Sequence, residues 1–222
     1  MLTVEEIQTL IDSDHSSQQK RLARQGQRYY EGRHDILDTR IFYFDPQGVL
    51  QEDKYKSNIR ISHPFFTELV DQQVQYMLSG DPQHIKSKIP RLQQQLDDYF
   101  DPDFYTELSD LLTGTASKGF DYLCAVTDAE GKTRFEYADS LGVVDDGCEY
   151  IIYWYIDRVD KGRKAIKRIQ VWDKDQIWFY VQVQQGQIVP DDTVPLNPRP
   201  HTLFTDQKGR QYQKGFGYLP FF

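Results

Sequence analysis

Residues 149–183, EYIIYWYIDRVDKGRKAIKRIQVWDKDQIWFYVQV, decide the fold, because they contain three successive runs with the composition of β-strands. We assign strands to Glu149–Asp157, Ala165–Trp172 and Ile177–Val183, since each run is rich in β-branched and aromatic residues. Short polar segments with turn-forming residues separate the runs. Such an order is typical of an antiparallel meander.

The three runs differ in the burial that their patterns predict. Residues 151–156 are apolar at every position, so this strand should lie centrally with both faces covered. In residues 177–183, aliphatic and phenyl side chains alternate with Trp178, Tyr180 and Gln182, which favours a half-exposed antiparallel strand. Further upstream, Tyr122–Thr127 and Arg134–Tyr137 flank a turn signal at 129–132, and Leu141–Val144 is a short strand.

The first half of the chain has helical patterns. Thr3 and Glu6 form a capping box ahead of a helix at about 4–13, and a polar helix runs from about 16 to 31 before Gly32. A helix of such polarity lies on a surface or against a neighbouring subunit. Two more helices are expected at about 90–100 and 103–119.

A strong apolar stripe follows Ser62-His63-Pro64. We expect Ser62 to cap this helix and Pro64 to occupy its first turn. The spacing of three and four residues places the following side chains on one face: Phe65, Phe66, Leu69, Val70, Val74, Met77 and Leu78. Gly80 and Pro82 end the helix. We expect this stripe to be core that packs under the antiparallel sheet.

Helices first and strands later predict an α+β fold. We divide the chain into residues 1–60, with the N-terminal helices and an arm, and residues 61–222, an α+β domain. Residues 33–60 have no long period, and Asp45–Gly48 is a turn signal, so this arm is irregular or a hairpin and is a candidate for reaching a neighbour. The aromatic end, Gly217–Phe222, predicts either a chain cut from a longer one or a segment that docks on a partner.

The composition excludes several classes of protein. The 222 residues are 39% apolar and 14% aromatic, which excludes a disordered chain. No run approaches the ~20 apolar residues of a membrane span, and no secretory signal is present. The net charge of −8 is concentrated in residues 101–150, where 12 acidic residues outnumber 3 basic ones. Such a chain does not grip nucleic acid through a broad basic surface.

One basic cluster stands out against this acidity. It consists of Arg158, Lys161, Arg163, Lys164, Lys167 and Arg168. Three interpretations remain open: a solvated hairpin tip, a contact with DNA or an acidic partner, or a contact with the acidic 101–150 region of a neighbouring copy. The last would let identical subunits close head to tail into a ring.

No pattern of catalytic chemistry is present. The histidines share no metal-ligand spacing, and the two cysteines, Cys124 and Cys148, are too few for a disulfide framework or a zinc site. Adjacent carboxylates occur at 97–98, 145–146 and 191–192, but neighbouring side chains diverge on both helices and strands. We therefore predict no catalytic residue, no metal site and no cofactor, and we expect a structural protein that is not an enzyme.

Three stretches together resemble the portal protein family of long-tailed bacteriophages (siphophages). They are YYEGRHDIL at 29–37, NIRISHPFF at 58–66 with its continuation to YMLSGDP at 76–82, and GYLPFF at 217–222. The resemblance implies that the chain is a subunit of the portal, the ring at one vertex of the phage head that connects head and tail. In this family the ring has about twelve copies. Double-stranded DNA would pass through that ring during packaging and ejection without sequence-specific contacts.

The resemblance further implies particular partners and a particular part of the ring. The chain corresponds to the peripheral wing region, without the stem, clip and tunnel regions of the family. Its implied partners are other portal subunits, terminase, the capsid or scaffold and the head–tail adaptor. The implied location is the virion, and the host cytoplasm during assembly. No membrane is implied as a partner. An alternative is a prophage-encoded adaptor module that binds protein without forming a ring.

Overall fold

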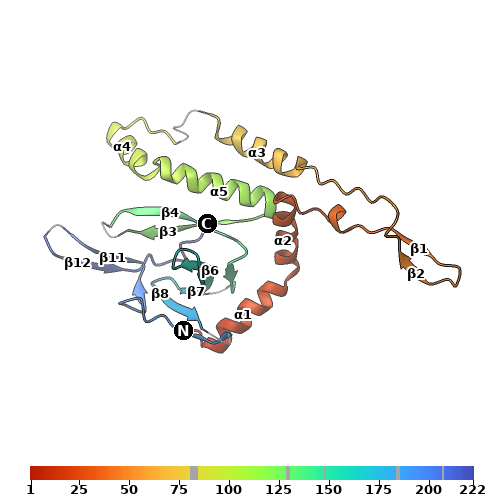
Figure 1. Cartoon of the computed structure of the whole chain (residues 1–222). Coiled ribbons are helices and arrows are strands. Elements are labelled where there is room, and N and C mark those ends of the chain that lie inside the picture. Colours follow the sequence, from red (N-terminus) through yellow and green to blue (C-terminus); the bar gives the residue numbers. More distant parts are fainter. Residues whose placement is uncertain (81–84, 129–130, 148, 184–185, 207) are drawn as a thin grey trace.

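The computed structural model describes the chain except for residues 81–84, 129–130, 148, 184–185 and 207 (Figure 1). Its helices are α1 (Val4–Ser16), α2 (Gln18–Tyr30), the 3-10 turn η1 (Asp35–Asp38), α3 (Phe65–Leu78), α4 (Pro90–Tyr99) and α5 (Pro102–Lys118). Its strands are β1 (Phe42–Phe44), β2 (Leu50–Glu52), β3 (Tyr122–Thr127), β4 (Thr133–Ala138), β5 (Val143–Asp145), β6 (Ile151–Val159), β7 (Lys164–Trp172), β8 (Gln176–Gln182), β9 (Ile188–Pro190), β10 (Arg199–Pro200), β11 (Thr202–Thr205) and β12 (Gln211–Lys214).

The predicted meander is the main sheet, and the α+β class is confirmed. The strand order is β10-β8-β7-β6-β5, with β9 also pairing with β8, and every pairing is antiparallel. The hairpins β1–β2, β3–β4 and β11–β12 form three separate two-stranded sheets. Helices α3, α4 and α5 lie on the far side of β3–β4 from the main sheet (Figure 1). Sequence patterns missed the short strands β9 and β10 and the last hairpin, β11–β12.

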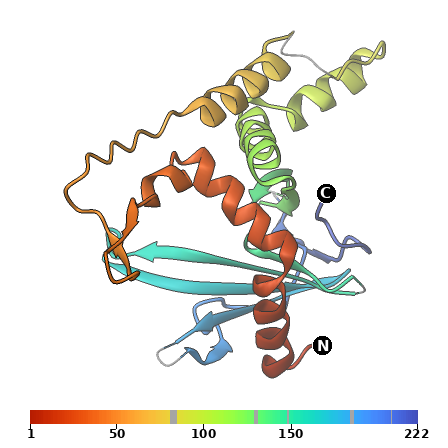
Figure 2. The ribbon, with the colours of Figure 1, turned by 90° about the vertical axis from the view of Figure 1, so that its right-hand side faces the viewer.

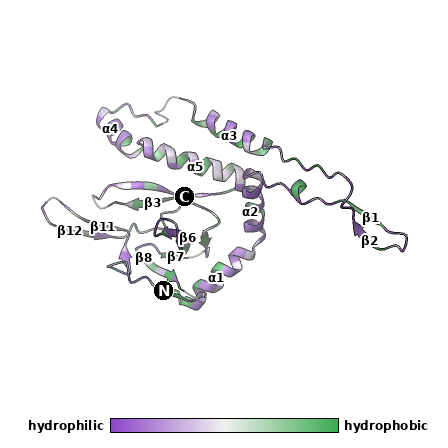
Figure 3. Ribbon diagram, in the orientation of Figure 1, coloured by the Kyte–Doolittle hydropathy of each residue, from purple (hydrophilic) through white to green (hydrophobic). Residues whose placement is uncertain are grey.

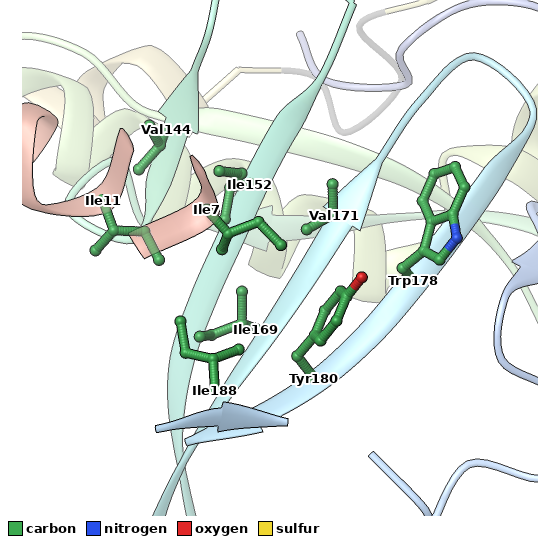
Figure 4. Packing of buried hydrophobic residues seen from close by; sticks show 9 residues of the cluster. All are labelled: Ile7, Ile11, Val144, Ile152, Ile169, Val171, Trp178, Tyr180 and Ile188. Atoms are coloured by element: carbon green, nitrogen blue, oxygen red, sulfur yellow. The ribbon is translucent and has the colours of Figure 1, made fainter. Parts of the chain in front are cut away.

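One face of the main sheet is covered by α1. The capping box at its start is present, with Thr3 and Glu6 bonding to each other's backbone N–H. Ile7 and Ile11 point from this helix into a cluster contributed by β5 to β9 (Figure 4). Trp178 and Tyr180 of β8 belong to this cluster, so the expectation of a half-exposed strand is wrong. Both faces of β8 are covered because Ile177 packs on the opposite side.

The C-terminal segment and β3–β4 cover that opposite face. Phe222 exchanges two backbone hydrogen bonds with Leu123, with N···O distances of 2.9 and 3.0 Å. Phe221 packs edge-on against Trp172, with 5.4 Å between the ring centroids. The aromatic end of the sequence is thus docked within its own chain, as an added strand beside β3.

The apolar stripe of α3 does not pack under a sheet, so that expectation is wrong. Helix α3 contacts α5 and α2, and only Val70 and Val74 of the stripe are buried. Phe65 is 64% exposed and Leu69 is 65% exposed. The stripe is wider than the surface that two helices can cover, because ridge-and-groove packing buries only a narrow seam.

The expected Ser62 cap is also wrong. The Ser62 hydroxyl donates to the Gly32 carbonyl oxygen at 2.8 Å, and α3 begins at Phe65 without a side-chain cap. The hydroxyl therefore fastens the end of one element to the start of another. The division between residues 60 and 61 stays a prediction, although α1 shares its core with β5 to β9.

The polar helix α2 packs closely on α5, which its composition did not indicate. Ala23 is buried, and a Cβ atom added to Gly26 would lie 2.0 Å from the Ser117 backbone oxygen. Small residues at these positions let the two helix backbones approach each other.

This close approach gives a prediction for Gly26→Ala. Alanine in a helix normally stabilises it by about 1 kcal/mol over glycine, but overpacking costs about 1–3 kcal/mol. We expect Gly26→Ala to lower the free energy of unfolding by about 1–2 kcal/mol in urea titrations. Gln25→Ala, at the exposed neighbouring position of α2, should change it by less than about 0.5 kcal/mol. A Gly26→Ala variant more stable than the wild type would contradict the packing.

Candidate interaction surfaces

Residues 33–64 form an arm that leaves the end of α2, turns at the β1–β2 hairpin and returns to α3. The arm projects away from the helices and the sheet (Figure 1). None of its residues is buried. The predicted irregular arm with a hairpin is confirmed, and its pairing runs from Phe42 opposite Glu52 to Phe44 opposite Leu50.

Polar side chains of the returning segment tie the arm together. Asn58, Arg60 and Ser62 each donate a hydrogen bond to a backbone carbonyl oxygen of the outgoing segment. The acceptors are Thr39 at 2.9 Å, Leu37 at 2.7 Å and Gly32 at 2.8 Å, respectively. Because successive side chains of an extended chain point to opposite sides, positions 58, 60 and 62 share one side. The alternation of polar and apolar residues in Asn58-Ile59-Arg60-Ile61-Ser62 is the sequence pattern that indicates these one-sided hydrogen bonds.

The intervening side chains point outward. Ile59 is 79% exposed, Ile61 is 60% exposed, and Phe44 at the hairpin is 72% exposed. Hydrophobic residues also mark η1 and α3 in the part of the molecule remote from the main sheet (Figure 3). An arm that is held in shape by its own hydrogen bonds and exposes several large apolar side chains is typical of a protein-contact surface.

The root of the arm is held between α2 and α3. The Tyr30 hydroxyl donates to Asp71 at 2.8 Å, and Thr67 donates to the Tyr30 carbonyl oxygen at 2.6 Å. Partial burial, together with the Asp71 carboxylate, raises the pKa of Tyr30 to about 12. Tyr29 and Arg28 both bond to Asp35 at the start of the arm.

A buried network of charges joins α2 and α5 to the strands. The Lys118 ammonium lies 2.8 Å from the Asp121 carboxylate and 2.6 Å from that of Asp139. The Tyr137 hydroxyl donates to Asp121 at 2.8 Å, and burial raises the pKa of that tyrosine. A Cβ on Gly114 would lie 1.6 Å from an Asp121 oxygen, so only glycine leaves room for this carboxylate.

Lys20 extends this network to α2. Its ammonium donates to the backbone carbonyl oxygens of Ser140 and Val143 and lies 3.1 Å from Asp14. Burial lowers the pKa of Lys20, although Asp14 opposes that shift. The charges in this network are paired, which is how buried ions are tolerated. The network fixes α2 on the body, and with it the direction of the arm.

The structure divides the predicted basic cluster into two parts. Arg168 lies within the β6–β7 sheet, 2.7 Å from Asp157, and also pairs with Asp191. Lys167 stands over the Trp154 ring, 4.3 Å from its centroid, and burial lowers its pKa. The other four cations, which we call the basic tip, are exposed around the turn: Arg158, Lys161, Arg163 and Lys164.

The remaining sequence candidates do not assemble into a site. Within the described ranges, no group of three histidine, cysteine, aspartate or glutamate residues could hold a metal ion. Cys124 is buried, and its burial raises its pKa. His84 and Cys148 lie outside the described residues. Of the adjacent carboxylate pairs, Asp191 is bonded to Arg168, which gives it a structural role.

Comparison with known proteins gives one result that covers almost the whole chain. A family described as phage portal protein, SPP1 Gp6-like, matches residues 11–222. A search of curated proteins finds no significant match. None of the described helices is both long and apolar enough to cross a bilayer.

The ties within the arm give a second prediction. Each lost hydrogen bond should raise the population of the locally open arm about fivefold. We expect Asn58→Ala/Ser62→Ala to accelerate tryptic cleavage after Lys54 and Lys56 by at least about fivefold, with an unchanged melting temperature. The matched control is Ile59→Ala/Ile61→Ala, which alters the outward side chains of the same segment. Equal cleavage rates for the two double variants would show that the ties do not order the arm.

Proposed function

The chain belongs to the SPP1 Gp6-like family of phage portal proteins, and from this premise we propose that it is the peripheral wing part of the portal, fastened to neighbouring copies by its arm. Members of this family are structural virion proteins that assemble as oligomers with other head proteins and DNA. In the proposal, residues 61–222 correspond to the wing-like domain, and residues 1–60 supply the N-terminal helices and most of the arm.

The exposed apolar arm carries this proposal. Its side chains contribute nothing to the core of their own chain, yet hydrogen bonds hold it in a defined shape. Binding through a preformed segment loses less conformational entropy than binding through a disordered one. A ring places an identical neighbour beside each subunit, so an arm of this kind always has a partner within reach.

The charge distribution agrees with passive passage of DNA. Apart from the basic tip, the chain has no dense run of lysine and arginine, and its net charge is −8. Tight binding of DNA would require many phosphate contacts and would oppose sliding. We further propose that DNA is packaged and ejected through a ring of about twelve such subunits. The other proteins in contact with this ring are terminase, the capsid or scaffold and a head–tail adaptor. The proposal also includes assembly of the ring in the host cytoplasm and a prophage as the source of the gene.

Substitution of the arm aromatics tests the proposal. Phe42→Ser/Phe44→Ser removes two rings whose burial is worth a few kcal/mol at about 25 cal/mol per Å². We expect the apparent dissociation constant for self-assembly to rise at least about tenfold, by sedimentation and native mass spectrometry, with unfolding free energy unchanged within about 0.5 kcal/mol.

Lys54→Ser/Lys56→Ser is the matched control, because it replaces two exposed polar residues of the same arm. Assembly of the Phe42→Ser/Phe44→Ser variant at wild-type concentrations would contradict the role of the arm. A wild-type chain that binds other head proteins but stays monomeric would favour the adaptor alternative.

A further inference from the structure

The basic tip lies at the β6–β7 turn, and its four cations are exposed. Arg158, Lys161, Arg163 and Lys164 make no ion pair within the described part of the chain. Asp160 and Lys161 have φ angles of 52° and 54°, and Gly162 follows at 83°, so the turn is tight. Below it, Arg168 and Lys167 fix the strands to the sheet.

A groove with complementary chemistry lies between α4, α5 and β4. It has a volume of about 250 Å³, and an adjoining hollow shares Tyr99 and Lys132 with it. Phe104 and Phe135 pack edge-to-face within it, with 5.6 Å between their centroids. Four carboxylates line the groove with these rings, and Asp98 lines the adjoining hollow. The four are Asp101, Asp103, Glu107 and Glu136.

The groove keeps an excess of negative charge after its internal pairs are counted. Its two cations are Lys132, which lies 3.3 Å from Asp101, and Arg134, which pairs with Asp128 at 3.0 Å and lies 3.8 Å from Asp103. Five carboxylates against these two cations leave a net negative charge. Acidic groups beside aromatic faces bind lysine and arginine through both ion pairs and cation–π contacts. The chemistry of the groove therefore selects a cationic segment.

The tip and the groove cannot meet within one chain. In Figure 2 the turquoise β6–β7 turn lies at the left of the molecule, and the yellow-green helix α4 lies at the right. Two different, complementary surfaces on opposite sides of a subunit make head-to-tail contacts, and such contacts close into rings.

We propose that the basic tip of each subunit docks in the α4–α5–β4 groove of the next copy. This inference rests on the proposed function in one respect, because it assumes that copies stand side by side. The arm supplies apolar area, whereas the tip supplies orientation, since charge complementarity fixes register and the choice of partner more than affinity. Arg134 and Lys132 at the groove would repel a tip that approached in the wrong register.

Charge reversal in both surfaces tests the docking. We expect Lys161→Glu/Lys164→Glu and Asp98→Lys/Asp103→Lys each to weaken self-assembly about tenfold, and their combination in one chain to restore it to within about threefold. Lys208→Glu/Lys214→Glu, on the exposed β11–β12 hairpin, is the control of equal charge change and should assemble normally. Normal assembly of either single-surface variant, or no rescue by their combination, would overturn the inference.

A cross-link separates this docking from the arm contact. In a Cys148→Ser background, we expect chains with Lys161→Cys and chains with Asp103→Cys to form a disulfide on mixing, whereas Lys208→Cys should not pair with Asp103→Cys. Arm-dependent multimers without the 161–103 cross-link would overturn the docking and leave the proposed function standing. If the cross-link forms but Phe42→Ser/Phe44→Ser leaves assembly unchanged, the docking stands and the proposed role of the arm is overturned. If neither multimers nor the cross-link form, both the docking and the proposed function are overturned.

Binding to DNA is the competing outcome. Fluorescence anisotropy with a duplex of about 30 base pairs should show equally weak binding by the wild type and the Lys161→Glu/Lys164→Glu variant. Tight wild-type binding that this variant loses, together with normal self-assembly, would make the tip a DNA contact and overturn the docking.

Discussion

The buried ion pair between Lys118 and Asp121 is the constraint on which the rest of the structure depends. It stands where α5 ends and β3 begins, and Asp139 and Tyr137 of the next segments join it. An ion removed from water is stable only when partners surround it closely, so this point tolerates few alternative arrangements. Lys20 adds α2 to the same junction. The helices therefore meet the strands in one orientation.

With the helices held in that orientation, the molecule consists of a body and an arm, which are stabilised by different interactions. The body buries two apolar clusters on the two faces of the main sheet, one beneath α1 and one beneath β3–β4 and the C-terminal segment. The arm has no core, and its shape comes from side chains that bond to backbone carbonyl oxygens. Its exposed apolar groups contribute no stability to the single chain, which makes them available for burial in an assembly.

Some of these features could be predicted from the sequence, and others could not. The capping box, the turn of the β6–β7 hairpin and the strand order of the meander follow from contacts within a few residues. The sequence indicates the arm as a segment without helical or strand periodicity. The alternation of polar and apolar residues at 58–62 indicates which side chains hold the arm together. The covering of β8 was not visible, because the groups that cover it come from α1 and from residues near the C-terminus.

The sequence by itself determined most of the helices and the three long strands of the meander, because caps, turns and periodicity act through neighbouring residues. It also placed six cations around one turn. Only the tertiary structure decided that Arg168 and Lys167 belong to the sheet while the other four stay free. It alone decided that Val70 and Val74 are buried while Phe65 is exposed. The physical reason is that burial depends on what lies opposite a side chain, and those partners are distant in the sequence.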